Sequence, residues 1–200
     1  MRSLRRAPSD DRSWRDVAMV ALDFETTTAD PDRAEPLSVG WVGLGDGRVR
    51  MAEAGYTLVD HRGEVPVESI RIHRLVPEEL RAGVLPDELG DVLRGAVAER
   101  VLVAHGASLE QRLLDRWGVP YAASLDTLRI VRTLDRRAGR PTADARLPEA
   151  ARRYGVPRLA AHQAFTDALT TALLLVSLAG RLEADRGRCT MSDLLLLSRD

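Results

Sequence analysis

The feature that most constrains the fold is an apolar run, residues 17–22, that ends in two carboxylates two positions apart, Asp23 and Glu25. A short apolar run without turn residues is typical of a buried strand. Because side chains alternate across a strand, both carboxylates should emerge on the same face. The sequence therefore predicts a central strand that carries two neighbouring acidic groups.

Two carboxylates this close repel one another, and an ordinary fold would protonate one of them or avoid the pair. A divalent cation removes the conflict, and hard carboxylate oxygens suit Mg²⁺ or Mn²⁺. The pair of Asp23 and Glu25 taken alone is more typical of solvated acids at the end of a strand. Residues further along the chain decide between these two interpretations.

The bulk composition is that of an ordinary globular domain. A chain of 200 residues with 44% hydrophobic and 30% charged residues predicts one soluble domain with a full core. The formal net charge is −1, so no global basic field favours nucleic acid, although a local basic groove is sufficient for a single strand. All 29 cationic side chains are Arg, which excludes a P-loop lysine and a lysine nucleophile.

The sequence predicts a cytoplasmic location. The single cysteine, Cys189, can make no intrachain disulfide, which fits a reducing compartment. Residues 1–16 are charged and lack the apolar region of a signal peptide, so we expect a flexible N-terminal arm. The apolar stretches at residues 173–176 and 194–197 are too short to span a membrane.

The pattern of elements predicts an α/β layered domain over residues 17–184 and a C-terminal tail, residues 185–200, that can pack as a short helix. Residues 64–74 are expected to be irregular. Strands are expected at 17–24, 37–44, 48–59, 101–105 and 124–126. Helices are expected at 76–80, 89–100, 108–117, 127–134, 147–154 and 167–184. Successive strands followed by strand–helix alternation indicate a mixed sheet.

Three further polar residues fall at matching places in this pattern. Glu110 lies in the first turn of the helix after the strand that ends at His105, His162 lies in the loop before the last long helix, and Asp167 opens that helix. Ligands of open α/β sheets gather at such strand ends and helix starts. Each residue alone could be an ordinary surface group or an acid at a helix N-terminus. Together with the first pair they favour one site.

These residues lie in three motifs that resemble those of the DEDDh-type 3′–5′ exonucleases of the DnaQ-like family. The motifs are Asp23-Phe24-Glu25-Thr26-Thr27, His105-Gly106-Ala107-Ser108-Leu109-Glu110 and His162-Gln163-Ala164-Phe165-Thr166-Asp167-Ala168. The supporting stretches are Ile72-His73-Arg74-Leu75, Asp126-Thr127-Leu128 and residues 147–156. The resemblance extends over residues 17–178. It implies a three-layer ribonuclease H-like fold with a mixed five-stranded sheet flanked by helices.

The chain departs from the family pattern at three positions. Glu110 stands where the family has Asp, Gly106 where it has Asn, and Thr28 where it often has Gly. The first departure keeps the charge and adds one methylene, so the side chain can still reach a metal or a metal-bound water. The other two leave substrate preference open.

The resemblance implies a catalytic centre with two divalent metal ions, Mg²⁺ or Mn²⁺, roughly 3.5–4 Å apart. It assigns Asp23 to both ions, Glu25 and Asp167 to the ion that carries the attacking water, and Glu110 to the second ion. His162 would be the general base, because an imidazole can accept a proton near neutral pH.

The resemblance also implies the substrate contacts. Phe24 and Thr26 would flank the 3′-terminal nucleotide, and 5′-mononucleotides would be released. Exposed arginines are candidate phosphate contacts, although most exposed arginines only confer solubility; these candidates are Arg74, Arg112, Arg136, Arg137 and Arg140.

Three functions are compatible with these residues. The leading one is a metal-dependent 3′–5′ exonuclease acting on single-stranded nucleic acid, with DNA favoured. The second is an oligoribonuclease or an RNA 3′-end processing enzyme, which would use the same site and a different groove, since contacts to the 2′-OH cannot be placed from sequence. The third is a nucleic-acid-binding, proofreading-like subunit with a weak site, favoured only by Glu110. A DNA polymerase or a homodimer is a possible partner, and no membrane partner is expected.

Overall fold

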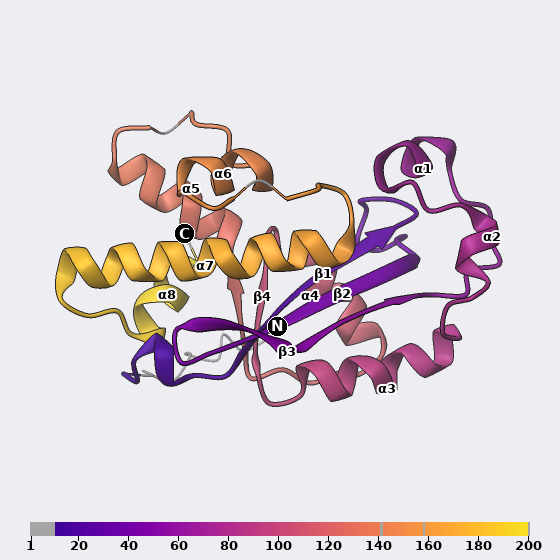
Figure 1. Ribbon diagram of the computed structural model, residues 1–200, viewed down its shortest axis with the longest axis horizontal. Helices are drawn as coiled ribbons and strands as arrows, with labels where there is room; N and C mark the ends of the chain where they lie inside the picture. Colours follow the sequence, from indigo (N-terminus) through magenta and orange to yellow (C-terminus); the bar gives the residue numbers. More distant parts are fainter. Residues whose placement is uncertain (1–10, 141, 158, 200) are drawn as a thin grey trace, which may run out of the picture.

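The protein is built on a mixed five-stranded sheet (Figure 1). The computed structural model describes residues 11–199 except 141 and 158. The strands are β1 (Met19–Thr26), β2 (Pro36–Gly45), β3 (Arg48–Leu58), β4 (Val101–Ala104) and β5 (Ala123–Asp126). Their order is β3-β2-β1-β4-β5, with β1 antiparallel to β2 and parallel to β4. The predicted α/β class and five-stranded mixed sheet are confirmed.

Strand β1 is the centre of the sheet because it is apolar on both faces. Val20 and Leu22 belong to one buried cluster, and Met19 and Ala21 belong to another on the opposite face. Parallel pairing with β4 places the ends of both strands at one edge of the sheet. This edge is where the acidic residues of β1 emerge.

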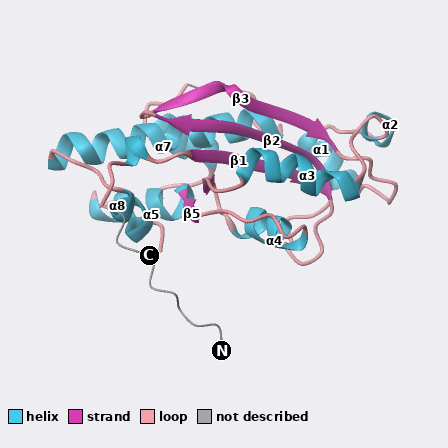
Figure 2. Ribbon diagram, turned by 90° about the horizontal axis from the view of Figure 1, so that it is seen from below, coloured by secondary structure: helices cyan, strands magenta, loops and turns pink. Residues whose placement is uncertain are grey.

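Helices cover both faces of the sheet and complete three layers (Figure 2). On the face of Val20 and Leu22 lie α3 (Pro86–Val97) and α4 (Ser108–Arg116). On the other face lie α5 (Thr127–Arg137), α6 (Leu147–Arg153), α7 (Ala164–Arg186) and α8 (Met191–Leu197). Burial on both faces explains why β1 and β4 are continuous apolar runs rather than alternating ones.

Helix α7 is the main core helix and packs along β1 and β2 (Figure 1). By length and composition alone, this 23-residue helix could cross a membrane, and half of its most apolar window is buried inside the fold. The whole of α7 is therefore more apolar than the two short stretches at 173–176 and 194–197 suggest. The physical reason is that its Ala and Leu residues face a sheet on one side and α5 and α6 on another.

Two local predictions are wrong. Residues 64–74 are not irregular, because α1 spans Val67–His73, followed by α2 (Pro77–Leu80). Part of the expected N-terminal arm is packed as a short 3₁₀ helix, Trp14–Asp16, with Trp14 only 1% exposed. The indole belongs to the core cluster of α7 and α8, which the local charge of the segment could not reveal. Residues 1–10 of the expected arm lie outside the described part of the chain.

Candidate metal and nucleic-acid site

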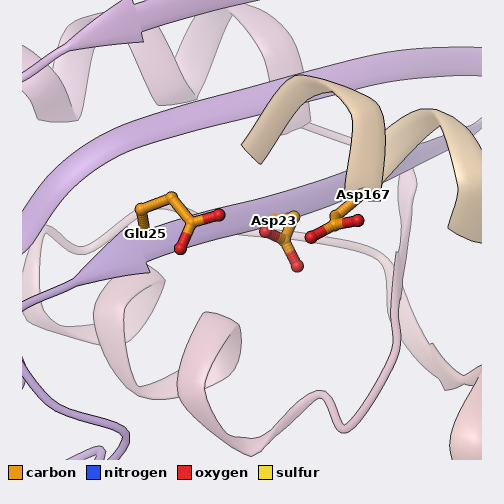
Figure 3. A group of neighbouring side chains, drawn as sticks. All are labelled: Asp23, Glu25 and Asp167. Carbon is orange, nitrogen blue, oxygen red and sulfur yellow. The ribbon is translucent and has the colours of Figure 1, made fainter. Parts of the chain in front are cut away.

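Three carboxylates meet at the end of the central strand (Figure 3). Asp23 and Glu25 project from the same face of β1, and Asp167 comes from the first turn of α7. One oxygen from each lies within 4.8 Å of those of the other two. The structure therefore brings together residues that are about 140 positions apart, in the arrangement expected of a metal site.

A glycine in β2 allows α7 to start so close to β1. Gly40 pairs directly with Asp23 across the β1–β2 ladder. A Cβ atom at Gly40 would clash with the backbone of Ala164 and Phe165 at the start of α7. Sequence reasoning missed Gly40, although a glycine inside an apolar strand often marks a close approach of another backbone.

Glu110 is the fourth acidic residue, from the first turn of α4. Its side chain is buried, with 5% exposure, and Oε2 has no hydrogen-bond partner among the described residues. Glu110 does not belong to the group of three within 4.8 Å, but it lies near enough to Asp23 for its charge to raise the pKa of Asp23. An unpartnered buried carboxylate oxygen near an acidic cluster fits a site that accepts a cation.

The electrostatics of the four carboxylates are unfavourable without a cation. Burial, followed by repulsion from the other three acids, raises the pKa of Asp23 well above its usual value. Burial raises the pKa of Glu25 to about 7 and that of Glu110 to about 8, and it also raises the pKa of Asp167. Among the ion pairs of the described residues, none joins these acids to an arginine. The donor set therefore fits hard divalent cations.

His162 lies beside this cluster in the loop before α7. Its side chain is exposed, and its backbone adopts a positive φ of 62°, which is uncommon for a residue other than glycine. Its backbone N–H donates a hydrogen bond to Oδ2 of Asp167 at 2.9 Å. His162 and Asp167 line a cavity of about 550 Å³, and Leu128 and Arg132 of α5 line the same cavity.

A model of the RNase_T exonuclease family matches residues 20–175 of the chain. The chain belongs to this family. The match confirms the resemblance to DnaQ-like exonucleases, and it includes every acidic residue of the site and His162.

Among curated proteins, this exonuclease-family chain is similar to the PolC-type DNA polymerases III of Thermotoga maritima and Thermotoga petrophila. It is 27% identical to each over 170 residues. The match covers 82% of the chain, and the chain spans only 12% of the length of each of these relatives.

Solved exonuclease structures share the fold. Exonuclease X in complex with 5′ overhanging duplex DNA superposes with a TM-score of 0.69 at 20% identity, covering 90% of this chain and 99% of that one. A zinc-bound complex of E. coli exonuclease I with single-stranded DNA gives a TM-score of 0.68 at 15% identity. This match covers 86% of the present chain and 42% of the exonuclease I chain. These likenesses confirm the ribonuclease H-like three-layer fold.

The second exonuclease motif is held in place by Asp126, at the end of β5. Its Oδ1 accepts hydrogen bonds from the backbone N–H groups of Gly106 and Leu128, both at 2.9 Å, and its Oδ2 accepts one from Ala107 at 3.2 Å. Asp126 thus caps α5 and fixes the loop that leads to Glu110. Sequence reasoning found Asp126 only as part of a supporting stretch.

His105, the first residue of the same motif, has a structural environment. Its Nε2 lies 2.8 Å from the carbonyl oxygen of Ala145, and its Nδ1 lies 2.9 Å from Oγ1 of Thr127. Burial lowers the pKa of His105, which favours the neutral form of the ring. With both nitrogens engaged, His105 is not available as a general base.

A cleft of about 700 Å³ opens at the end of β1 and is lined by Phe24, Glu25 and Thr26. The Phe24 side chain points away from the acidic face into the α3–α4 core and is only 5% exposed, so it offers little ring surface for stacking on a base. Oγ1 of Thr26 donates a hydrogen bond to the carbonyl oxygen of Thr28 at 2.8 Å. Contacts of both residues with a terminal nucleotide stay a prediction.

The far wall of this cleft is tied to β1 by two residues of α1. Nδ1 of His73 accepts a hydrogen bond from the backbone N–H of Leu75, so Nε2 carries the proton and donates to Oγ of Ser69 at 2.7 Å. Ser69 in turn donates to the carbonyl oxygen of Thr26 at 2.8 Å. These hydrogen bonds fix the end of β1 next to Glu25, and the sequence indicated His73 only as part of a supporting stretch.

Proposed function

We propose that this protein is a metal-dependent 3′–5′ exonuclease that removes 5′-mononucleotides from single-stranded nucleic acid, with DNA favoured. The observation that carries the proposal is the convergence of Asp23, Glu25 and Asp167 within 4.8 Å, with no ion pair from an arginine of the described part of the chain. Such a cluster is costly unless cations occupy it. Membership of an exonuclease family supplies the reaction that the cations serve.

The residues that would hold two ions, Mg²⁺ or Mn²⁺, are Asp23, Glu25, Glu110 and Asp167. When bound, the ions would stabilise the charge that develops on the attacking and leaving oxygens at phosphorus. The burial of Glu110 and the half-buried position of Asp23 limit the access of water, which strengthens these interactions. Glu110 keeps the charge of the family's aspartate, which argues against an idle site.

His162 would act as the general base that takes the proton of the attacking water. Its exposed side chain on a loop can approach or leave the phosphorus, while its backbone N–H remains bonded to Asp167. A base must come within hydrogen-bond reach of the proton that it removes, and apo geometry alone does not exclude such a group. The leaving 3′-oxygen belongs to the penultimate nucleotide.

The substrate proposal rests on the cleft and on the relatives. The cleft at the end of β1 would take the 3′-terminal nucleotide beside Glu25 and Thr26. The similar structures of exonuclease X and exonuclease I are DNA complexes, and the curated relatives are DNA polymerases, so DNA is favoured over RNA. The same likeness supports a DNA polymerase as partner and a cytoplasmic location.

The proposal is tested by digesting 5′-labelled single-stranded DNA and RNA of matched sequence with Mg²⁺ or Mn²⁺. We expect a ladder that shortens from the 3′ end, releases mononucleotides, and disappears in EDTA and in Asp23→Ala. Asp91→Ala, which removes an exposed acid on α3, is the matched control and should retain activity. Cleavage that persists in Asp23→Ala, or that releases long fragments, would contradict the proposal.

A further inference from the structure

A second, larger groove runs beside α5 and the edge strand β5. We call it the α5 groove; it has a volume of about 1180 Å³. Its charged lining consists of one carboxylate, Asp126, and four arginines: Arg12, Arg129, Arg132 and Arg199. The α5 groove is therefore strongly basic in a chain whose formal net charge is −1.

The α5 groove adjoins the cavity of His162 and Asp167. Leu128 and Arg132 line both spaces, so they form the common border between them. Arg132 is also close enough to His105 for its positive charge to contribute to the lowered pKa of that ring. A ligand can therefore extend from the acidic cluster across α5 into the groove.

Arg132 is available for a ligand, whereas other arginines near the site are engaged. The Arg132 side chain is exposed and has no ion pair or hydrogen bond with any residue that the structure describes. Arg129 pairs with Asp126 and with the carbonyl oxygen of Arg199. Other arginines form ion pairs with carboxylates away from the site, with N–O distances of 2.6 to 3.1 Å; examples are Arg112, Arg140 and Arg146.

The cleft at the end of β1 has the opposite charge balance. It is lined by three glutamates, Glu25, Glu64 and Glu68, and by one arginine, Arg33. A 3′-terminal nucleotide with a free 3′-OH carries only one phosphate, the scissile one. That phosphate would be neutralised by the metal ions, so the cleft itself needs no cationic side chains. The strand on the 5′ side brings one negative phosphate for each nucleotide and needs cationic side chains. The acidic cleft and the basic α5 groove therefore favour one strand polarity, with the 3′ end in the cleft and the 5′ side in the groove.

We infer that the single strand on the 5′ side of the scissile phosphate follows the α5 groove, and that Arg132 binds one of its backbone phosphates. The inference rests on the proposed exonuclease function and specifies the path of its substrate. Arg12, Arg199 and α8, which complete the groove, lie outside residues 20–175, the part that matches the exonuclease family. Part of the groove therefore lies outside the segment that matches the family, while Arg132 lies inside it.

The test compares a long and a short substrate in Arg132→Ala. The long one is an oligothymidylate of about ten nucleotides, which is long enough to fill a single-strand groove. The short one is the p-nitrophenyl ester of thymidine 5′-monophosphate, which reaches only the metal site and the terminal cleft. We expect the KM for the oligonucleotide to rise about tenfold, the loss typical of one charge-assisted hydrogen bond, and kcat/KM for the ester to stay unchanged.

The salt dependence gives a second readout. Because one phosphate contact on a single strand contributes about 0.7 to the slope of log K against log salt, Arg132→Ala should make the slope shallower by about 0.7. Arg132→Lys keeps the charge and should retain most of the slope. Arg81→Ala is the control, because Arg81 is exposed at the end of α2 and lines neither the α5 groove, nor the His162 cavity, nor the cleft at the end of β1.

The outcomes separate this inference from the proposed function. If the unmodified protein hydrolyses neither substrate, the exonuclease function fails and the strand path with it. If it hydrolyses both, but Arg132→Ala behaves like Arg81→Ala in KM and salt slope, the strand path is overturned while the function stands. Loss of ester hydrolysis in Arg132→Ala would also overturn it, because Arg132 would then act on the terminal nucleotide.

Discussion

The backbone N–H of His162 donates a hydrogen bond to Oδ2 of Asp167 at 2.9 Å. The expected base and an expected metal ligand are thus linked through the backbone, while the imidazole itself stays exposed on its loop. Since the bond uses the backbone of His162, the two side chains can be changed separately.

Substitutions at these two positions should separate metal binding from proton transfer. His162→Gln should lower kcat by about 10²–10⁴-fold and keep the rise in Tm that Mn²⁺ produces. Asp167→Asn should lower kcat at least as much and greatly reduce that rise, because a ligand charge is lost. The measurements are oligonucleotide hydrolysis and thermal unfolding with and without Mn²⁺. A His162→Gln protein that no longer responds to Mn²⁺ would contradict the separate roles.

Gly40→Ala should disturb the site from the neighbouring strand. A methyl group at Gly40 meets the backbone of Ala164 and Phe165, so α7 must shift and carry Asp167 away from Asp23. We expect a loss of about 1–3 kcal/mol in the free energy of unfolding and weaker Mn²⁺ binding. The control is Gly95→Ala in α3, where nothing lies within 4 Å, which should stabilise by about 0.5–1 kcal/mol. Equal effects of the two changes would refute the close-packing argument.

Glu110→Gln should stabilise the metal-free protein at pH 8 and impair hydrolysis. The substitution removes a buried carboxylate whose charge raises the pKa of Asp23, so repulsion in the cluster falls. We expect Tm in EDTA to rise and kcat to fall by about 10²-fold or more, measured side by side. Glu110→Asp keeps the charge and should retain hydrolysis. A lower Tm for Glu110→Gln would show that its charged form is stabilised by groups other than metal.

Stability without metal should fall as the pH rises from about 4.5 to 8. The pKa of Glu25 rises from 4.5 to about 7 on folding, and that of Glu110 from 4.5 to about 8. A carboxyl whose folded pKa is raised binds its proton more tightly in the folded state, so its contribution is present at low pH and is lost through the folded pKa. Unfolding in EDTA across this range measures the effect, and Mn²⁺ should raise Tm more at pH 8 than at pH 5. A Tm in EDTA that rises over this range would contradict the raised pKa values.

Ser69→Ala should weaken the attachment of α1 to β1. It leaves Nε2–H of His73 and the carbonyl oxygen of Thr26 without their shared partner. A buried polar group left unpaired costs about 1–3 kcal/mol, which urea unfolding can measure. Ser108→Ala, at an exposed position on α4, serves as the control and should change stability by less than about 0.5 kcal/mol. A Ser69→Ala protein as stable as this control would show that solvent replaces the bridge.

Much of the fold could be predicted because the relevant signals are local. The apolar run before Asp23 predicts β1, and the expected strands at 37–44 and 48–59 correspond to β2 and β3, which the local turn Gly45-Asp46-Gly47 joins. Helix α1 was missed because its seven residues, Val67–His73, are half polar, begin after a proline and have no side-chain cap. Trp14 was missed because its neighbours are charged, while its indole is buried by contacts with distant elements.

The sequence by itself determined which acidic residues belong to the site. It also determined that Asp23 and Glu25 lie on the same face of a strand, because strand periodicity is a property of neighbouring residues. Only the tertiary structure decided that Gly40 admits α7 and that Glu110 is buried near Asp23. It also placed Arg132, which has no ion pair among the described residues, on the border between the α5 groove and the His162 cavity. These relationships depend on the packing of segments far apart in the chain. Burial and charge in a site are set by that packing, which no local pattern contains.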